Sequence, residues 1–355
     1  MSQGLEGVVA AETALSMVDG ERGELIIVGF PIEELAPNAT FEETVRLLWN
    51  GNLPDVSNRE LSKIAFEILR AAADRRDDPM DALREAAGVL LPDQLFPAFP
   101  TIVAGYWRIL HGQKPIAPSR DLGHAANYLY MLSGEVPSNE RVRALETYLN
   151  TVVDHGLNAS TFTARVITST GSDLVSAIVG AVGALKGPLH GGAPGPALDM
   201  VFEIAEAGRA EEVLRRKIES GERLMGFGHR VYKVRDPRAD VLAAAAERLY
   251  ARDGDMRLYE LARAVERTAI RLLEEYKPGR RLQTNVEFYT ALVLHGLGLE
   301  TPLFTPTFAI SRVAGWIAHC LEQRRVNRII RPQSIYVGPR GRVWGKKPAP
   351  SPVVC

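Results

Sequence analysis

The chain has 355 residues, 46% of them hydrophobic, and a single hydrophobic core seldom organises so many residues. We therefore expect two domains. Its 42 basic and 43 acidic residues leave a formal net charge of -1, so no overall field draws the chain to nucleic acid or to an anionic membrane. An anionic ligand would have to be held by a local group of basic side chains.

The N-terminal residues predict a small β-hairpin, and most of the remaining chain has a helical period. Residues 14–18 and 24–30 lean towards strands and are separated by a turn sequence at 19–23. Thr40 and Glu43 then form the pattern of a capping box at the start of a helix. The sequence therefore predicts an all-α protein with one small hairpin.

A later amphipathic helix brings a histidine inwards. Val142, Leu145, Leu149 and Val152 form one apolar stripe, and His155 falls on the same face where this helix ends. We therefore expect His155 to point into the protein.

Another helix is predicted to run from an N-cap at Ser172 to Lys186 and is apolar on every side. We therefore expect it to be buried. Its small residues Ser176, Gly180 and Ala184 lie four apart, which suits either close packing in the core or a contact between subunits. Further helices are predicted for residues 236–252, 258–277 and 308–325. An irregular tail is predicted for residues 338–355.

The cysteines and the hydrophobic runs indicate a compartment. Cys320 and Cys355 stand at neither metal-binding nor redox spacing, which excludes a disulfide framework and suits a reducing environment. The first residues lack a basic segment followed by a long apolar run, and the longest apolar run, at 174–185, is too short to span a bilayer. We expect a cytoplasmic protein.

Four polar segments interrupt the helical pattern, in turns or at helix ends where reactive groups tend to lie. They are residues 154–158, 187–192, 226–230 and 285–289, and three of them carry a histidine. Glycines beside two of these histidines leave room for a sharp bend or for a close ligand. Taken one at a time, each segment is more typical of an ordinary turn or core.

Two arginines occupy positions where a positive charge is unfavourable without a partner. Arg238 lies in the first turn of a helix that we expect to begin at Asp236 and Pro237, where it opposes the helix dipole. It is either solvated or shares an anion with the free backbone N–H groups. Arg312 lies in a helical row with Phe308 and is expected to be partly buried, paired with either an internal carboxylate or a ligand carboxylate.

Motifs of other enzyme classes are absent from the sequence, which contains no HExxH, CxxC, GxSxG or GxxxxGK[ST]. A metal site built from His155, His190, His229 and Glu287 would lack the helical i, i+4 spacing. We therefore expect no metal.

Several segments resemble the citrate synthase family and follow that family's order. The clearest are DHGLNASTFTARV at 154–166, GALKGPLHGGA at 183–193, MGFGHRVYK at 225–233 and NVEFYT at 285–290. Shorter matches extend the similarity over essentially the whole chain. The resemblance implies an all-α homodimer with a large domain at 1–192 and 299–355 and a small mobile domain at 193–298.

The resemblance also implies that acetyl-CoA and oxaloacetate are condensed to citrate and free CoA, with no cofactor besides the thioester. Glu287 would remove a proton from the methyl group, His190 would stabilise the enolate oxygen, and His229 would donate to the keto oxygen. Besides these two histidines, the side chains implied to bind oxaloacetate are His155, Arg238, Arg312 and, from the partner subunit, Arg331. Those implied to bind CoA are Leu224, Met225, Gly226, Gly228 and Lys233.

One motif departs from the family's pattern. Glu287 stands where aspartate is usual and Thr290 where serine is common, so the base is one methylene longer. A misplacement of about 1 Å can cost roughly a hundredfold in rate, so citrate formation would be slow unless the backbone compensates. Two alternatives stay open: a 2-methylcitrate synthase that uses propionyl-CoA, and a ligand-binding paralogue with little activity.

Overall fold

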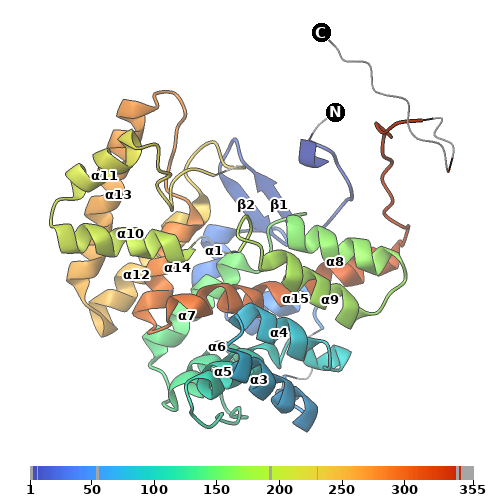
Figure 1. Ribbon diagram of the computed structural model, residues 1–355. Helices are drawn as coiled ribbons and strands as arrows, with labels where there is room; N and C mark the ends of the chain where they lie inside the picture. The colour runs from blue at the N-terminus through green and yellow to red at the C-terminus, as the bar shows by residue number, and fades with distance from the viewer. Residues whose placement is uncertain are drawn as a thin grey trace.

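The computed structural model describes residues 3–5, 7–52, 56–191, 194–229, 231–340 and 344 and is mainly helical (Figure 1). The first half contains η1 (Gln3–Leu5), β1 (Ser16–Asp19), β2 (Glu24–Ile27), β3 (Phe30–Pro31), α1 (Ile32–Asn38), α2 (Phe41–Leu48), α3 (Lys63–Arg75), α4 (Pro79–Ala87), η2 (Pro92–Gln94), α5 (Phe99–Leu110), α6 (His124–Ser133) and α7 (Asn139–Val152). The second half contains α8 (Ala159–Ser169), α9 (Leu174–Leu185), α10 (Pro194–Ala207), α11 (Ala210–Glu219), α12 (Pro237–Asp253), α13 (Met256–Tyr276), α14 (Val286–Gly296), η3 (Thr301–Leu303) and α15 (Phe304–Arg325).

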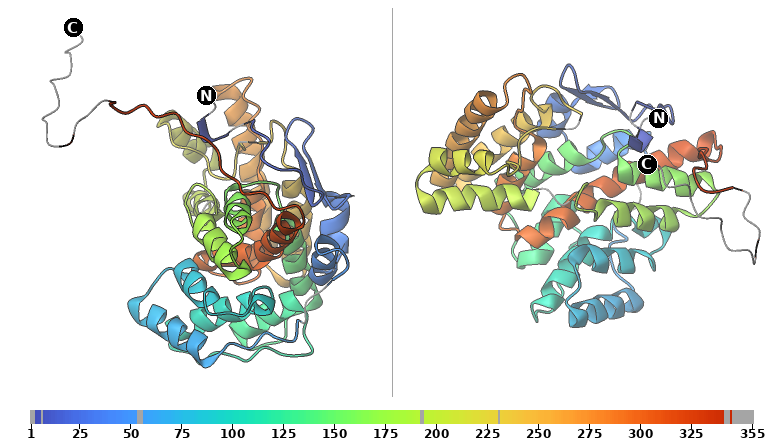
Figure 2. Two further views of the ribbon diagram at one scale, coloured as in Figure 1. Left: turned by 90° about the vertical axis from the view of Figure 1, so that its right-hand side faces the viewer. Right: turned by 45° about the horizontal axis from the view of Figure 1, so that its top comes forward.

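Helix α15 crosses the middle of the molecule (Figure 1), and α7, α8 and α9 pack against it. Most residues of α15 are apolar or small and are buried, and Trp316 near its centre is fully buried. Helices α10 to α14 lie together at one side, whereas α3 to α6 lie at another. After α15 the chain runs away from the helical body as an irregular segment (Figure 2).

The expected hairpin and helix start are confirmed. Strands β1 and β2 pair antiparallel across the turn at 19–23, and a short third strand, β3, which the sequence did not indicate, pairs with β2. The backbone N–H of Thr40 donates to the Glu43 carboxylate at 2.8 Å, and the Glu43 N–H donates to the Thr40 hydroxyl at 3.2 Å. This is the predicted capping box at the start of α2.

The prediction that the helix now labelled α9 is buried all round is wrong. Its N-cap is Asp173 rather than Ser172, and one face carries the exposed residue Ser176. Gly180 is on the packed side, because an added Cβ would lie 2.4 Å from Ile167 of α8. The close packing expected of this glycine therefore occurs within the chain, whereas Ser176 and Gly183 of α9 are exposed.

The hairpin turn contacts a segment far along the sequence. The Lys233 N–H donates to the Gly20 carbonyl at 2.8 Å, and an added Cβ on Gly20 would lie 2.1 Å from the Val231 carbonyl oxygen. Glycine at this position therefore allows the hairpin to touch the segment that leads into α12.

Some expectations fall outside the described residues, namely those on Arg230, the domain boundary at 192/193, Cys355 and the tail beyond 340 apart from 344. Cys320 is described and is a buried free thiol. Among the described helices, none combines the length and the apolar character that crossing a membrane requires.

Candidate active site

His155 follows the end of α7 and points inwards, as its place on the apolar stripe predicts. Its Nε2 lies 3.2 Å from the Tyr232 hydroxyl, and its ring centroid lies 6.0 Å from that of His229. Burial lowers the pKa of His155 well below the ordinary histidine value, and the positive charges of Arg238 and Arg312 lower it further. His155 is therefore neutral and close enough to both arginines for their charges to act on it.

His229 points one ring nitrogen at the backbone and the other at Arg238, whose Nη2 lies 3.5 Å from Nε2. Its Nδ1 accepts hydrogen bonds from the backbone N–H groups of Val231 at 3.0 Å and Tyr232 at 3.1 Å. An N–H group can only donate, so the proton of the neutral ring is on Nε2. Burial, together with Arg238, lowers the pKa of His229 to about 4. The two backbone contacts are shorter than the contact with Arg238 and decide the tautomer, so near neutral pH Nε2–H is a hydrogen-bond donor.

Arg238 is in the first turn of α12, and Asp236 caps this helix as expected. The anion beside Arg238 is Asp236 itself, which binds the guanidinium through Nε at 3.0 Å and Nη2 at 2.8 Å. The same carboxylate accepts the Val286 N–H at the start of α14 at 3.2 Å. Arg238 is only 4% exposed, so the alternative of a solvated arginine is wrong. One carboxylate thus joins Arg238 to the helix that carries Glu287.

Arg312 is fully buried in α15 without an acidic partner. Its Nε donates to the Val152 carbonyl at 2.7 Å, and its guanidinium carbon lies 4.6 Å from the centroid of the Phe308 ring. No ion pair of Arg312 occurs in the described part of the chain. Burial lowers its pKa to about 10 although Asp154 lies near enough to raise it. We expected Arg312 to pair with either an internal carboxylate or a ligand carboxylate, and the described residues do not supply the internal one.

His190 lies in the turn after α9 and faces α8. Its Nε2 lies 2.8 Å from the Ser160 hydroxyl and accepts the Ser160 N–H at 3.4 Å. Trp316 of α15 donates to the same hydroxyl at 3.1 Å. The Ser160 hydroxyl also donates to Asn158 Oδ1 at 2.8 Å, so Asn158, Ser160 and His190 form one hydrogen-bonded chain. Burial and, secondarily, Arg312 lower the pKa of His190 to about 4.

Glu287 is in the first turn of α14. Its backbone N–H donates to Asn285, the N-cap, at 3.0 Å. No hydrogen bond to its carboxylate is present among the described residues, and no contact joins it to His190. Burial raises its pKa above the ordinary value of 4.5, an effect that Arg238 and Arg223 oppose. A half-buried carboxylate of raised pKa suits proton abstraction.

The residues expected to bind CoA form one backbone segment beside the start of α14. The Asn285 N–H donates to the Gly226 carbonyl at 3.0 Å, and the Asn285 amide donates to the Gly228 carbonyl at 2.8 Å. Both glycines have positive φ, 84° and 78°, which side chains disfavour. Leu224 is buried, Met225 is half-buried and Lys233 is exposed.

Arg331 is exposed on the irregular segment after α15, and no contact joins it to the other expected residues within the described chain. It lines a cavity of about 820 Å³ between this segment and the N-terminal residues. Arg165 and Glu322 line the same cavity.

The structure therefore gathers His155, His190, His229, Arg238 and Arg312 around one place, since the last four all act on the pKa of His155. Sequence reasoning missed four residues that position this group, namely Asp154, Ser160, Tyr232 and Asp236 as an ion-pair partner. Tyr232 is 3% exposed and contacts two of the histidines. Asp154 lies inside a polar segment, and Ser160 and Tyr232 each lie two residues beyond one, which was the available signal for these three.

The arrangement combines two histidine rings held by hydrogen bonds, two buried guanidinium groups and a carboxylate of raised pKa. Such a set can hold a small dianion, polarise two carbonyl oxygens and remove a proton from carbon. No group of three or more side chains suited to hold a metal ion is present in the part of the chain that the structure describes.

Comparison with known proteins decides the family. The model of the citrate synthase C-terminal domain family matches residues 4–333. The chain belongs to the citrate synthase family. Family membership confirms the resemblance of the motifs, the mainly helical fold and the assignment as an enzyme.

Relatives of this family cover nearly the whole chain. Citrate synthase 2 of Bacillus subtilis is 41% identical over 95% of this chain and 96% of its own length. A 2-methylcitrate synthase of Shewanella oneidensis is 38% identical over 94% of each chain. The citrate synthase of Thermoplasma acidophilum, solved as a ternary complex with carboxymethyl coenzyme A and oxaloacetate, is 29% identical and superposes with a TM-score of 0.87 over 97% of this chain and 98% of that chain.

Proposed function

We propose that the protein condenses acetyl-CoA with oxaloacetate and water to give citrate and free CoA. Arg312 is the observation that carries most weight. A buried guanidinium without an acidic partner is costly, and a ligand carboxylate would offset that cost. Arg238 and the neutral His155 lie beside it, which suits the two carboxylates and the keto group of oxaloacetate.

Enolisation of the thioester needs a base and a donor at the same time. Glu287 is the base that we propose for the methyl group of acetyl-CoA, because its raised pKa makes it a stronger proton acceptor than an exposed carboxylate. Ser160 holds one ring nitrogen of His190, and we propose that the His190 ring donates a hydrogen bond that stabilises the enolate oxygen. The two residues would approach each other when the small domain closes.

Attack on the keto acid needs a second donor. The methyl carbon of the enolate forms a bond to the keto carbon, whose oxygen becomes an alkoxide and takes a proton. His229 supports this step, since its Nδ1 accepts two backbone N–H groups and Nε2–H is therefore the donor of the ring. Water then cleaves the thioester and CoA leaves as the thiol. The reaction uses no cofactor beyond the CoA thioester, as citrate synthases need none.

We further propose a cytoplasmic homodimer in which Arg331 of the partner subunit completes the oxaloacetate site. The exposed face of α9 and the cavity beside Arg331 support a contact between subunits. The large domain would comprise residues 1–192 and 299–355, and the small domain, 193–298, would close over the substrates and bring the segment from Leu224 to Lys233 onto CoA.

The test is release of free CoA, followed with a thiol reagent, from acetyl-CoA and oxaloacetate. We expect turnover by the wild-type protein and by Glu287→Asp, and loss of at least about a hundredfold in kcat for Glu287→Gln, which removes the base. Equal turnover by Glu287→Gln would contradict the assignment of Glu287.

Two other functions give different results in the same assay. Relatives of similar identity include 2-methylcitrate synthases, so propionyl-CoA is compared with acetyl-CoA, and a higher kcat/KM for propionyl-CoA would make that the activity. One methylene in an apolar pocket is worth only about 1–3 kcal/mol, so both thioesters must be measured. Tight binding of oxaloacetate in calorimetry without turnover of either thioester would instead indicate a ligand-binding paralogue.

A further inference from the structure

One face of α15 contacts the last residues before His155, one after another. Arg312 donates to the Val152 carbonyl at 2.7 Å. An added Cβ on Gly315, almost one turn later, would lie 2.3 Å from the Val153 carbonyl oxygen. These close contacts hold α15 directly against the end of α7.

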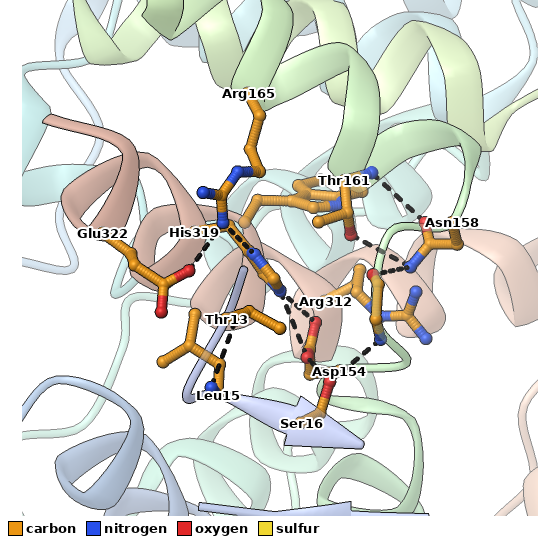
Figure 3. A network of polar contacts seen from close by, with 12 residues as sticks. Thr13, Leu15, Ser16, Asp154, Asn158, Thr161, Arg165, Arg312, His319 and Glu322 are labelled. Carbon is orange, nitrogen blue, oxygen red and sulfur yellow. Dashed lines mark hydrogen bonds and ion pairs between the residues drawn. The ribbon is translucent and has the colours of Figure 1, made fainter. Parts of the chain in front are cut away.

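The same helix face continues to a buried pair. His319 Nε2 lies 3.1 Å from one carboxylate oxygen of Asp154 and 3.2 Å from the other, and both side chains are fully buried (Figure 3). Arg312 and Asp154 are near each other but not bonded. The residue before His155 is thus tied to the helix that carries the unpaired arginine.

Strand β1 holds this segment from the other side. The Ser16 hydroxyl donates to the Asp154 carboxylate at 2.5 Å and accepts the Gly156 N–H at 3.0 Å. The residues on either side of His155 are therefore bound to one hydroxyl group. Rotation of this short loop would break at least two hydrogen bonds.

The protonation of His319 follows from Arg165 of α8. The guanidinium lies 3.0 Å from His319 Nδ1 and, because it can only donate, Nδ1 is the acceptor. The ring is then neutral, and its Nε2–H donates to Asp154. Arg165 also binds Glu322 at 2.6 Å and Gln323 at 3.0 Å. Figure 3 shows the resulting chain from Glu322 through Arg165 and His319 to Asp154.

We infer that Asp154 and His319 are positioning residues of the keto acid site, which hold His155 and Arg312 in one fixed relation through contacts of α15 with the end of α7. This inference rests on the proposed function. It extends that function because both side chains are fully buried and act only through others. They align the side chains that bind the carboxylates of the substrate. The charges around His319 balance, since Arg165 and Arg312 oppose Glu322 and Asp154.

The test compares His319→Phe with His319→Gln in the full-length protein. Phenylalanine fills the space but cannot donate to Asp154, whereas glutamine offers one donor and one acceptor. We expect His319→Phe to raise Kd and KM for oxaloacetate about tenfold or more, because a small misplacement of His155 and Arg312 weakens their binding of the keto acid. KM for acetyl-CoA should change less than about threefold. His319→Gln should recover most of the loss.

His124→Phe is the matched control, because His124 is also a fully buried histidine of a helix but lies outside the site. It should leave both KM values unchanged. If His319→Phe does not fold, Ser16→Ala removes only the hydroxyl that holds Asp154 and Gly156 and should itself raise KM for oxaloacetate.

Unchanged oxaloacetate binding by His319→Phe, or by Ser16→Ala where the first variant does not fold, would overturn the inference even if stability falls. Such a result would mean that the hydrogen bonds from Glu322 to Asp154 serve only to stabilise the fold. Wild-type protein that binds no oxaloacetate would instead contradict the proposed function, and the inference with it.

Discussion

The hydroxyl of Tyr289 donates a 2.5 Å hydrogen bond to the buried carboxylate of Glu266. The same carboxylate accepts hydrogen bonds from Thr284 at 2.7 Å, Arg235 at 2.8 Å and Arg263 at 3.0 Å. Glu266 of α13 therefore joins the segments that lead into α12 and α14, and both of these helices carry residues of the site. Four donors on two oxygens leave no room for a group that donates.

Glu266→Gln should destabilise the protein by about 3 kcal/mol, because the buried amide NH₂ group would face donors and leave two half-exposed arginines without their anion. Urea unfolding measures the change. The control is Glu275→Gln, since Glu275 binds Arg215 at a surface position where its side chain is 48% exposed. That change should cost less than about 1 kcal/mol. Equal losses for the two variants would contradict the role given to Glu266.

The pH dependence of turnover should report Glu287. Burial raises its pKa, and a base must be deprotonated, so kcat should fall as the pH falls through this raised value. Arg223 acts in the opposite direction by favouring the carboxylate. Arg223→Gln should therefore move the acidic limb of the kcat profile to higher pH, whereas Arg223→Lys keeps the charge and should leave the limb in place. A limb that moves to lower pH would exclude Glu287 as the group that titrates.

His124 should make the folded state sensitive to acid. Both ring nitrogens are buried without a hydrogen-bond partner in the described chain, and the ring stacks on Phe96 with a centroid distance of 4.5 Å. Burial lowers its pKa from 6.5 to about 3. Between these values the unfolded chain binds a proton that the folded chain does not, so stability falls as the pH decreases, by up to about 1.4 kcal/mol per pH unit.

His124→Phe keeps the stacking and removes the proton. Plots of unfolding free energy against pH from 7 to 4 should therefore be shallower for this variant than for the wild-type protein. The same substitution at the exposed His111 is the control. A slope that His124→Phe leaves unchanged would show that other groups account for the acid sensitivity.

Arg312→Met should separate ligand binding from folding. Methionine fills much of the same volume and leaves no buried cation, so the ligand-free variant should unfold within about 1 kcal/mol of the wild-type protein. Oxaloacetate at a hundred times its Kd should stabilise the wild type by about 2.7 kcal/mol and the variant much less. Thermal or urea unfolding with and without oxaloacetate measures both quantities. Full protection of the variant would remove Arg312 from the site.

Features that depend on a few neighbouring residues could be predicted from the sequence. The capping box of Thr40 and Glu43, the Asp236 cap and the hairpin each involve groups within one turn of chain, so local spacing suffices. The inward direction of His155 followed in the same way from the helical period of the preceding stripe.

Burial around a helix was less predictable. The apolar character of α9 indicated burial on every side, yet Ser176 is exposed and Gly180 packs on Ile167. Composition states what a helix can bury, whereas the neighbouring elements decide which face they cover.

By itself the sequence determined the family, the helical fold and the residue types at the candidate site, because these lie in short motifs and local periods. Only the tertiary structure decided that Arg312 has no acidic partner among the described residues, that Ser160 faces His190 and that His319 binds Asp154. Asp154 and His319 are 165 residues apart in the chain. Hydrogen bonds and desolvation depend on atoms within a few ångströms in space, and distance along the chain carries no record of that proximity.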